Sequence, residues 1–244
     1  TVYTALGIDP LRVRIAQYYR ETHDIDLSED RVAVTTGSSG GFMLAFLSAF
    51  DAGDRVALAD PGYPAYRNIL AALGIEAVAV QTSLEERYQP TPAALDRIAR
   101  ETGDIDGLIV ASPANPTGTM LLPDDMATLC AYCDDRGIRL ISDEIYHGIT
   151  YEAPGATALG YTPNAFVVNS FSKYYSMTGW RVGWMVLPGD LQRSVECLAQ
   201  NIFISVPTLS QRAACAAFDC TEELDINVAR YAANRELLLR ELPR

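Results

Sequence analysis

The residues with the clearest potential for chemistry lie in the segment Ser170-Phe171-Ser172-Lys173. The apolar run 165–170 predicts a buried strand, so Lys173 follows a strand end, between hydroxyl groups and aromatic side chains. A lysine shielded from water has a lowered pKa and becomes a nucleophile for aldehydes. Arg181 follows eight residues later, where its guanidinium can hold a phosphate through paired hydrogen bonds. A surface lysine and arginine are the alternative, and the glycines and aromatic residues around them argue against free exposure to solvent.

A second candidate is the small-residue segment 36–41, Thr-Gly-Ser-Ser-Gly-Gly, which includes Ser38 and Ser39. It lies between a predicted strand at 32–36 and a predicted helix at 41–50. Small residues let the backbone approach a phosphate, and the start of a helix offers free N–H groups. The segment lacks the lysine of a P-loop and the G-x-G-x-x-G of a dinucleotide fold, and a segment of this kind between a strand and a helix is usually just a turn.

Two further strand ends carry a side chain that could contact a planar ligand. Tyr63 follows the predicted strand 55–59, and neighbouring prolines fix the backbone so that its ring is available for stacking. Asn115 follows the predicted strand 106–111 and can donate a hydrogen bond to a ligand oxygen. Taken singly, Tyr63 is interpreted as a tyrosine packed over a turn, and Asn115 as part of an ordinary Asn-Pro turn.

A pair of carboxylates and a tyrosine follow the predicted strand 138–142, in the segment Asp143-Glu144-Ile145-Tyr146. A carboxylate at the mouth of a sheet is costly unless it is paired, and a protonated aromatic ring nitrogen would be a suitable partner. We favour Asp143 over Glu144 for this role because it follows the strand directly.

The elements that must position these residues alternate along the chain. Helices are expected at 10–22, 65–73, 91–101 and 123–136, further strands at 75–80 and 182–187, and mostly helix at 189–240 with a break at Pro207. Thr91 is a suitable N-cap for one helix, and Gly137 would end another. This alternation predicts βαβ units in a mainly parallel sheet, whose ligands bind at the carboxyl ends of the strands.

The composition excludes several classes of protein. The 244 residues carry a formal charge of −12, which disfavours binding to nucleic acid or to an anionic membrane, and 49% are hydrophobic, which argues against disorder. Apolar stretches such as 41–50 are too short to span a membrane. Five cysteines do not form a disulfide framework, and we expect a cytoplasmic protein. Cys130 and Cys133 form a lone C-x-x-C, which we interpret as two buried thiols and not as a metal or redox site.

In this order and spacing, the motifs resemble those of the fold-type I pyridoxal-phosphate enzymes, specifically the class I/II aminotransferases of the aspartate aminotransferase superfamily. The resemblance covers nearly the whole chain and implies a three-layer αβα domain with a mainly parallel sheet. It also implies pyridoxal 5'-phosphate as cofactor, with Lys173 as its Schiff-base lysine and as the base that moves the substrate proton.

The resemblance assigns a role to each remaining site residue. Asp143 would pair with the pyridine nitrogen, Tyr63 would stack on the ring, and Tyr146 and Asn115 would bind the phenolic oxygen. The phosphate would be held by Ser38, Ser39, Ser170 and Arg181, with Ser172 as an additional contact. Tyr3 is similar to a tyrosine that reaches the phosphate of the neighbouring subunit in a dimer, although its spacing to Gly7 is about one residue shorter than the common pattern.

The function implied is transfer of an amino group between an L-amino acid and a 2-keto acid by a homodimer. A lyase or synthase on the same scaffold, or a non-enzymatic ligand-sensing domain, are the alternatives. We expect residues 1–228 to form the cofactor-binding large domain and 229–244 to begin a small domain that is largely missing. The arginine that grips the substrate carboxylate would then lie outside this chain, which leaves the amino acid substrate open and the activity of these 244 residues alone in question.

Overall fold

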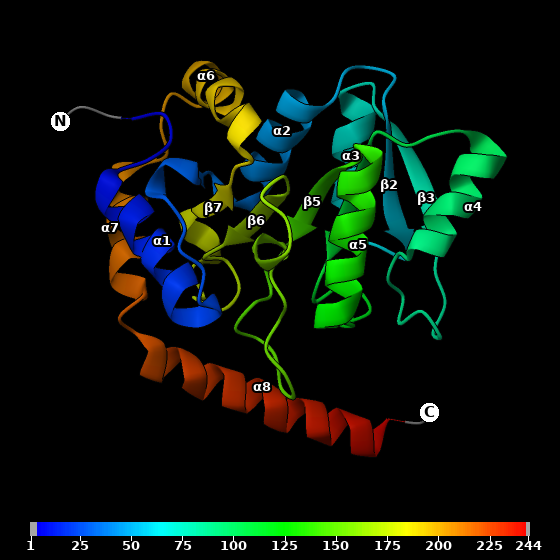
Figure 1. The fold of residues 1–244 in the computed structure, drawn as a ribbon. Coiled ribbons are helices and arrows are strands. Elements are labelled where there is room, and N and C mark those ends of the chain that lie inside the picture. The colour runs from blue at the N-terminus through cyan, green and yellow to red at the C-terminus, as the bar shows by residue number, and fades with distance from the viewer. Residues whose placement is uncertain (1–3, 243–244) are drawn as a thin grey trace.

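The computed structural model describes residues 4–242, which fold around one seven-stranded sheet (Figure 1). The strand order is β1-β7-β6-β5-β4-β2-β3. All pairs from β6 to β3 are parallel, whereas β7 is antiparallel to both of its neighbours. The prediction of a mainly parallel sheet is therefore confirmed. The strands are β1 (Val32–Thr35), β2 (Arg55–Asp60), β3 (Glu76–Gln81), β4 (Gly107–Ala111), β5 (Arg139–Asp143), β6 (Phe166–Ser170) and β7 (Gly183–Val186).

Helices cover both faces of the sheet and make the expected three layers. One buried apolar cluster joins the sheet to α1, α4, α5 and α7, and a second joins it to α2, α3 and α6. The helices are α1 (Asp9–His23), α2 (Gly37–Ala49), α3 (Pro64–Ala72), α4 (Pro92–Thr102), α5 (Pro123–Arg136), α6 (Gln192–Ile202), α7 (Thr208–Ala217) and α8 (Thr221–Glu241).

Strand β5 shows how the two faces are separated. Leu140 packs into the cluster beneath α1, α4, α5 and α7, and Ile141 packs into the cluster beneath α2, α3 and α6. Both clusters are apolar, which explains why the central strands read as continuous hydrophobic runs. Because side chains alternate along a strand, Ser142 and Asp143 at its end also point to opposite faces.

Local signals explain most helix ends. The Thr91 hydroxyl accepts a hydrogen bond from Ala94 N at 3.2 Å, and Gly137 ends α5 with φ of +67°. The helical pattern breaks before Pro207, as expected. In contrast, α2 begins at Gly37 and not at residue 41, so the small-residue segment forms the first turn of the helix.

The last helix, α8, lies along one end of the molecule and is mostly exposed (Figure 1). Leu224 is its one fully buried residue within the described chain. Asp225 accepts a hydrogen bond from Tyr174 OH at 2.8 Å, and Arg235 forms an ion pair with Glu152 at 3.3 Å. The domain boundary that we predict at 228/229 falls inside this single helix.

Two features are absent from the described chain. No helix between residues 4 and 242 is both long and apolar enough to cross a membrane. No group of three or more potential metal ligands lies within the same residues, 4–242. Cys130 and Cys133 are free and buried on α5, as expected.

Candidate active site

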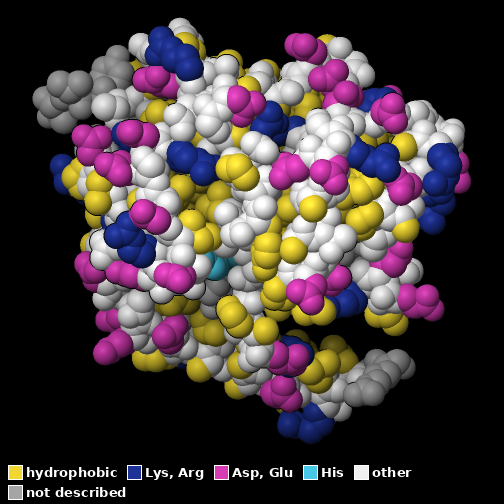
Figure 2. All heavy atoms as spheres, in the orientation of Figure 1, with side chains coloured by type: hydrophobic (Ala, Val, Ile, Leu, Met, Phe, Trp, Pro, Cys, Tyr) yellow, Lys and Arg dark blue, Asp and Glu magenta, His cyan; other side chains and the backbone are white. Residues whose placement is uncertain are grey.

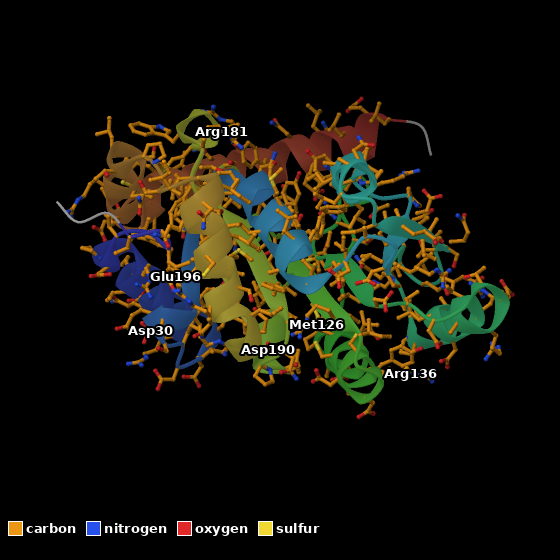
Figure 3. All side chains as sticks on the ribbon, turned by 90° about the horizontal axis from the view of Figure 1, so that it is seen from above. Asp30, Met126, Arg136, Arg181, Asp190 and Glu196 are labelled. Carbon is orange, nitrogen blue, oxygen red and sulfur yellow. The ribbon has the colours of Figure 1, made fainter. Side chains whose placement is uncertain are left out.

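A cavity of about 170 Å³ lies at the carboxyl edge of the sheet, between the strand ends and α2 and α3. Nine of the ten predicted site residues line it, and they come from segments far apart in the chain. Figure 3 shows Arg181 on the side of the molecule away from Arg136 and Asp190, which lie near the amino end of β5. The nine are Ser38, Ser39, Tyr63, Asn115, Asp143, Tyr146, Ser172, Lys173 and Arg181.

Asp143 is the buried acid of this cavity, with 5% of its surface exposed. Tyr66 donates its hydroxyl proton to Oδ2, and the backbone N–H of Ile145 donates to Oδ1 at 3.1 Å. Burial raises the pKa of Asp143 to about 6, and the two hydrogen bonds and the charge of Lys173 oppose that rise. The carboxylate is therefore held in place, yet its ionised form still lacks a full counter-charge.

Lys173 lies at the other side of the cavity and is half-buried. Its Nζ is 5.5 Å from the centre of the Tyr146 ring, within the range of a cation–π contact. The pKa of Tyr146 is raised, first by burial and then by the charge of Asp143, and Asn115 opposes the rise. An amine, a phenol and an amide thus meet next to the buried carboxylate.

Lys173 has a further property that the printed sequence shows directly, since it is the only lysine among the 244 residues. Every other fixed positive side chain is an arginine. A reagent that targets primary amines therefore has one side-chain target in this chain, and it lines the cavity.

Arg181 and the first turn of α2 form a close-packed corner of the cavity. Gly37 has φ of +73°, and a Cβ atom there would lie 2.5 Å from Arg181 Nη2. A Cβ on Gly183 would lie 2.8 Å from Asn169 O and 3.1 Å from Ser38 N. Backbone atoms leave no room for a Cβ on Gly183, and a Cβ on Gly37 would displace the Arg181 guanidinium, so the guanidinium and the N-terminus of α2 approach each other without intervening side chains. Free helix N–H groups, hydroxyls and a guanidinium are the donors that bind phosphate.

The expectation about shielding from solvent holds only in part. Lys173 is half-buried, but Arg181 is exposed in the described chain, so that part of the expectation is wrong. Arg181 Nη1 donates to Thr178 O at 2.9 Å, which holds the side chain over the corner without burying it.

Ser170 is the predicted site residue that does not line the cavity. It is buried, and its Oγ lies 3.2 Å from Val182 O and 2.9 Å from Ser172 Oγ. Its place is therefore behind Ser172, which it supports. Tyr3 lies outside the described residues.

The cavity also contains residues that the sequence reasoning missed. Tyr66 is the most important, because its hydroxyl binds Asp143. The signal was present, since Tyr66 follows Tyr63 by three residues at the start of a helix and therefore lies on the same side of it. The other missed residues are Phe42, Ala65, Ile69, Ala111, Ile145 and Thr178.

Comparison with known proteins gives a consistent result. Residues 2–244 match the family model described as aminotransferase class I and II. The chain is 52% identical over 244 residues to a valine–pyruvate aminotransferase of Mycobacterium tuberculosis, covering 98% of this chain and 62% of that protein. The crystal structure of an aminotransferase from Mycobacterium tuberculosis is similar with a TM-score of 0.93 at 52% identity, covering 98% of this chain and 66% of that one.

A crystal structure of a putative aminotransferase from Silicibacter pomeroyi is also similar, with a TM-score of 0.89 at 55% identity. That match covers 96% of this chain and 62% of the other. The chain thus spans roughly six tenths of the length of the curated relatives it matches.

Proposed function

The chain belongs to the class I and II aminotransferase family, and from that premise we propose that the protein is a pyridoxal-phosphate-dependent aminotransferase. It would move an amino group between an L-amino acid and a 2-keto acid. This proposal rests on one observation: the only lysine of the sequence, a buried carboxylate, and a group of phosphate-binding donors on Arg181 and the first turn of α2 all line one cavity.

The residues present fit the cofactor. The corner made by Gly37, Ser38, Ser39 and Arg181 has the donors and the free space that a phosphate group requires. Asp143 is a buried carboxylate with two donors, and a protonated ring nitrogen would supply the counter-charge that it lacks. When bound, pyridoxal phosphate would supply an electron sink for the substrate's α-carbon.

The chain's own residues would then do the following. Asp143 holds the proton on the pyridine nitrogen, and Tyr63, whose side chain is 41% exposed at the cavity, covers the ring. Tyr146 and Asn115 bind the phenolic oxygen. Lys173 would hold the cofactor's aldehyde through Nζ, and its amine, when not bound to the cofactor, would be the base that takes the proton from the substrate's α-carbon.

The substrate proposal rests on the relatives. At 52% identity over nearly the whole chain, the valine–pyruvate aminotransferase makes L-valine and pyruvate the first pair to test. We also propose that the protein acts as a cytoplasmic homodimer, in which Tyr3 would reach the phosphate of the neighbouring subunit. A cytoplasmic location agrees with five cysteines that are all free.

The test uses the full-length protein loaded with pyridoxal phosphate. We expect a visible absorption band that L-valine bleaches and pyruvate restores. Reduction with borohydride followed by peptide mapping should place the cofactor on Lys173, and Lys173→Ala should lose both the band and the label. A band that no amino acid bleaches would refute transamination, and a label elsewhere would refute the role of Lys173.

A further inference from the structure

A second carboxyl group lies directly behind the candidate site, on the reverse face of the sheet. Glu144 follows Asp143, so strand alternation turns its side chain toward α1 and α5. It is 0% exposed. Its Oε1 accepts hydrogen bonds from Ser142 Oγ at 3.0 Å and from Ala158 N at 2.9 Å, whereas Oε2 has no hydrogen-bond partner.

The imidazole of His147 faces Glu144 Oε2, and its tautomer can be assigned. His147 Nε2 lies 3.1 Å from Ser112 O, and a carbonyl can only accept, so Nε2 carries a hydrogen. In a neutral ring, Nδ1 then presents a lone pair, and it faces Glu144 Oε2 at 3.5 Å. Two lone pairs that face each other in a buried site repel. A proton on either atom would remove this repulsion.

A second histidine extends the cluster. The His23 ring centre is 5.6 Å from that of His147. Within residues 4–242, His23 Nε2 and Glu144 Oε2 are the two buried side-chain polar atoms without a partner, and both belong to this one cluster. Buried polar atoms in native proteins are normally paired, often through internal water. Figure 2 shows a histidine side chain in a recess on this face.

We propose that Glu144 and His147 hold one shared proton, with water linking them to His23, and that this cluster controls the charge beside Asp143 from the reverse face of the sheet. Glu144 is thus a positioning residue, because it acts on the cofactor site through Asp143. The cluster goes beyond the proposed function, since its proton exists whether or not the protein is an aminotransferase.

The direction of the coupling follows from burial. Burial raises the pKa of Glu144 to about 7 and lowers the pKa of His147 to about 4, so the pair loses its proton near neutral pH. The ionised Glu144 then repels the Asp143 carboxylate and raises its pKa. The pKa of His23 is lowered mainly by burial and secondarily by His147.

Apart from His147, His23 and Asp143, the groups that face Glu144 do not titrate near neutral pH. Burial raises the pKa of both tyrosines on α1 and raises that of the thiol on α5 to about 12, so all three stay neutral. The facing groups are Tyr18, Tyr19 and His23 on α1, Cys130 on α5, Ser142 and Asp143 on β5, and Thr157 beside Ala158.

The first experiment observes the shared proton directly in the full-length, cofactor-free protein labelled with 15N-histidine. His23→Gln and His147→Gln assign the two imidazoles. We expect His147 to keep its hydrogen on Nε2 while Nδ1 shifts with a midpoint near pH 7, and we expect Glu144→Gln to abolish that midpoint. Glu101→Gln, an exposed glutamate at the end of α4, should leave the curve unchanged. A neutral His147 protonated on Nδ1, or the same curve in Glu144→Gln, would overturn the proposal.

The second experiment follows the titration of the Asp143 carboxyl by 13C resonance in His147→Gln, with and without Glu144→Gln. His147→Gln supplies an N–H to Oε2 and favours ionised Glu144, so the Asp143 midpoint should rise. Adding Glu144→Gln removes that charge and should return the midpoint to its native value. Glu144→Gln alone should change the midpoint little, because Glu144, with a pKa of about 7, is still mostly protonated when Asp143 titrates near 6. General damage to packing would persist in the double variant. That result, or no shift in His147→Gln, would refute the coupling without bearing on the role of Lys173.

Discussion

Replacing Asp143 by Asn should stabilise the cofactor-free protein, because the native carboxylate is buried at an energetic cost. The pKa of Asp143 is raised from 3.8 to about 6, which corresponds to about 3 kcal/mol at 1.36 kcal/mol per unit. A group whose folded-state pKa is raised weakens the fold once it ionises. The penalty is absent below about pH 4, grows as pH rises to about 6, and is complete above that value. The amide side chain of the Asp143→Asn variant would keep an oxygen that accepts from Tyr66.

The measurement is the free energy of unfolding by urea, from about pH 4.5 to 8. At pH 8 the free energy of unfolding of Asp143→Asn should exceed that of the native protein by up to about 3 kcal/mol. This difference should shrink as pH falls through 6. Asp104→Asn, at an exposed carboxylate, is the matched control and should change little. A difference that is absent at pH 8, or that does not vary with pH, would show that burial does not set the charge state of Asp143. With cofactor bound, the order should reverse, since Asn lacks the negative charge that stabilises a protonated ring nitrogen.

Three other outcomes follow from the same geometry. Tyr66→Phe removes a hydrogen bond to the charged Asp143, worth about 1.5–3 kcal/mol, so the lowest pH at which the cofactor binds tightly should rise by about 1–2 units. Tyr132→Phe removes a similar hydrogen bond far from the cavity and should not change that pH. Gly37→Ala should weaken cofactor affinity and lower stability by about 1–2 kcal/mol. Gly53 also has a positive φ, but a Cβ atom there would have no neighbour within 4 Å, so Gly53→Ala should leave the affinity unchanged. Equilibrium titration with the cofactor measures both affinities. A thiol reagent should label the exposed Cys220 in the folded protein and reach the buried C-x-x-C pair of α5 only after unfolding; rapid labelling of that pair would contradict its burial.

Much of the cavity could be predicted because parallel strands bring their carboxyl ends to one edge. Asn115, Asp143 and Lys173 each follow a central strand, so one rule about sheets placed all three together. Helix α5 ended at Gly137 for an equally local reason. These features depend on neighbours within a few residues or on the direction of a strand, and a sequence records both.

The rest depends on contacts between distant segments. Tyr66 contacts Asp143 only because α3 packs near the end of β5. Ser170 does not line the cavity, because its hydroxyl donates to Val182 O. The alternation that separates Asp143 from Glu144 was available from the sequence, but the partner of Glu144 was not. His147 comes close through the turn that follows β5, and His23 arrives from α1, more than a hundred residues away.

The antiparallel edge of the sheet has a consequence for the order in which the protein is made. β1 pairs only with β7, and Arg31 Nε donates to Leu187 O across 156 residues of chain. On the ribosome, the turn that contains Ser38 and Ser39 is synthesised early but has no partner until β7 emerges. At about 5–20 residues per second, that interval is roughly 8–30 s. During it, the apolar edge of β1 must stay unpaired or be protected by a chaperone, and the nascent chain cannot bind phosphate at this corner until the last strand is in place.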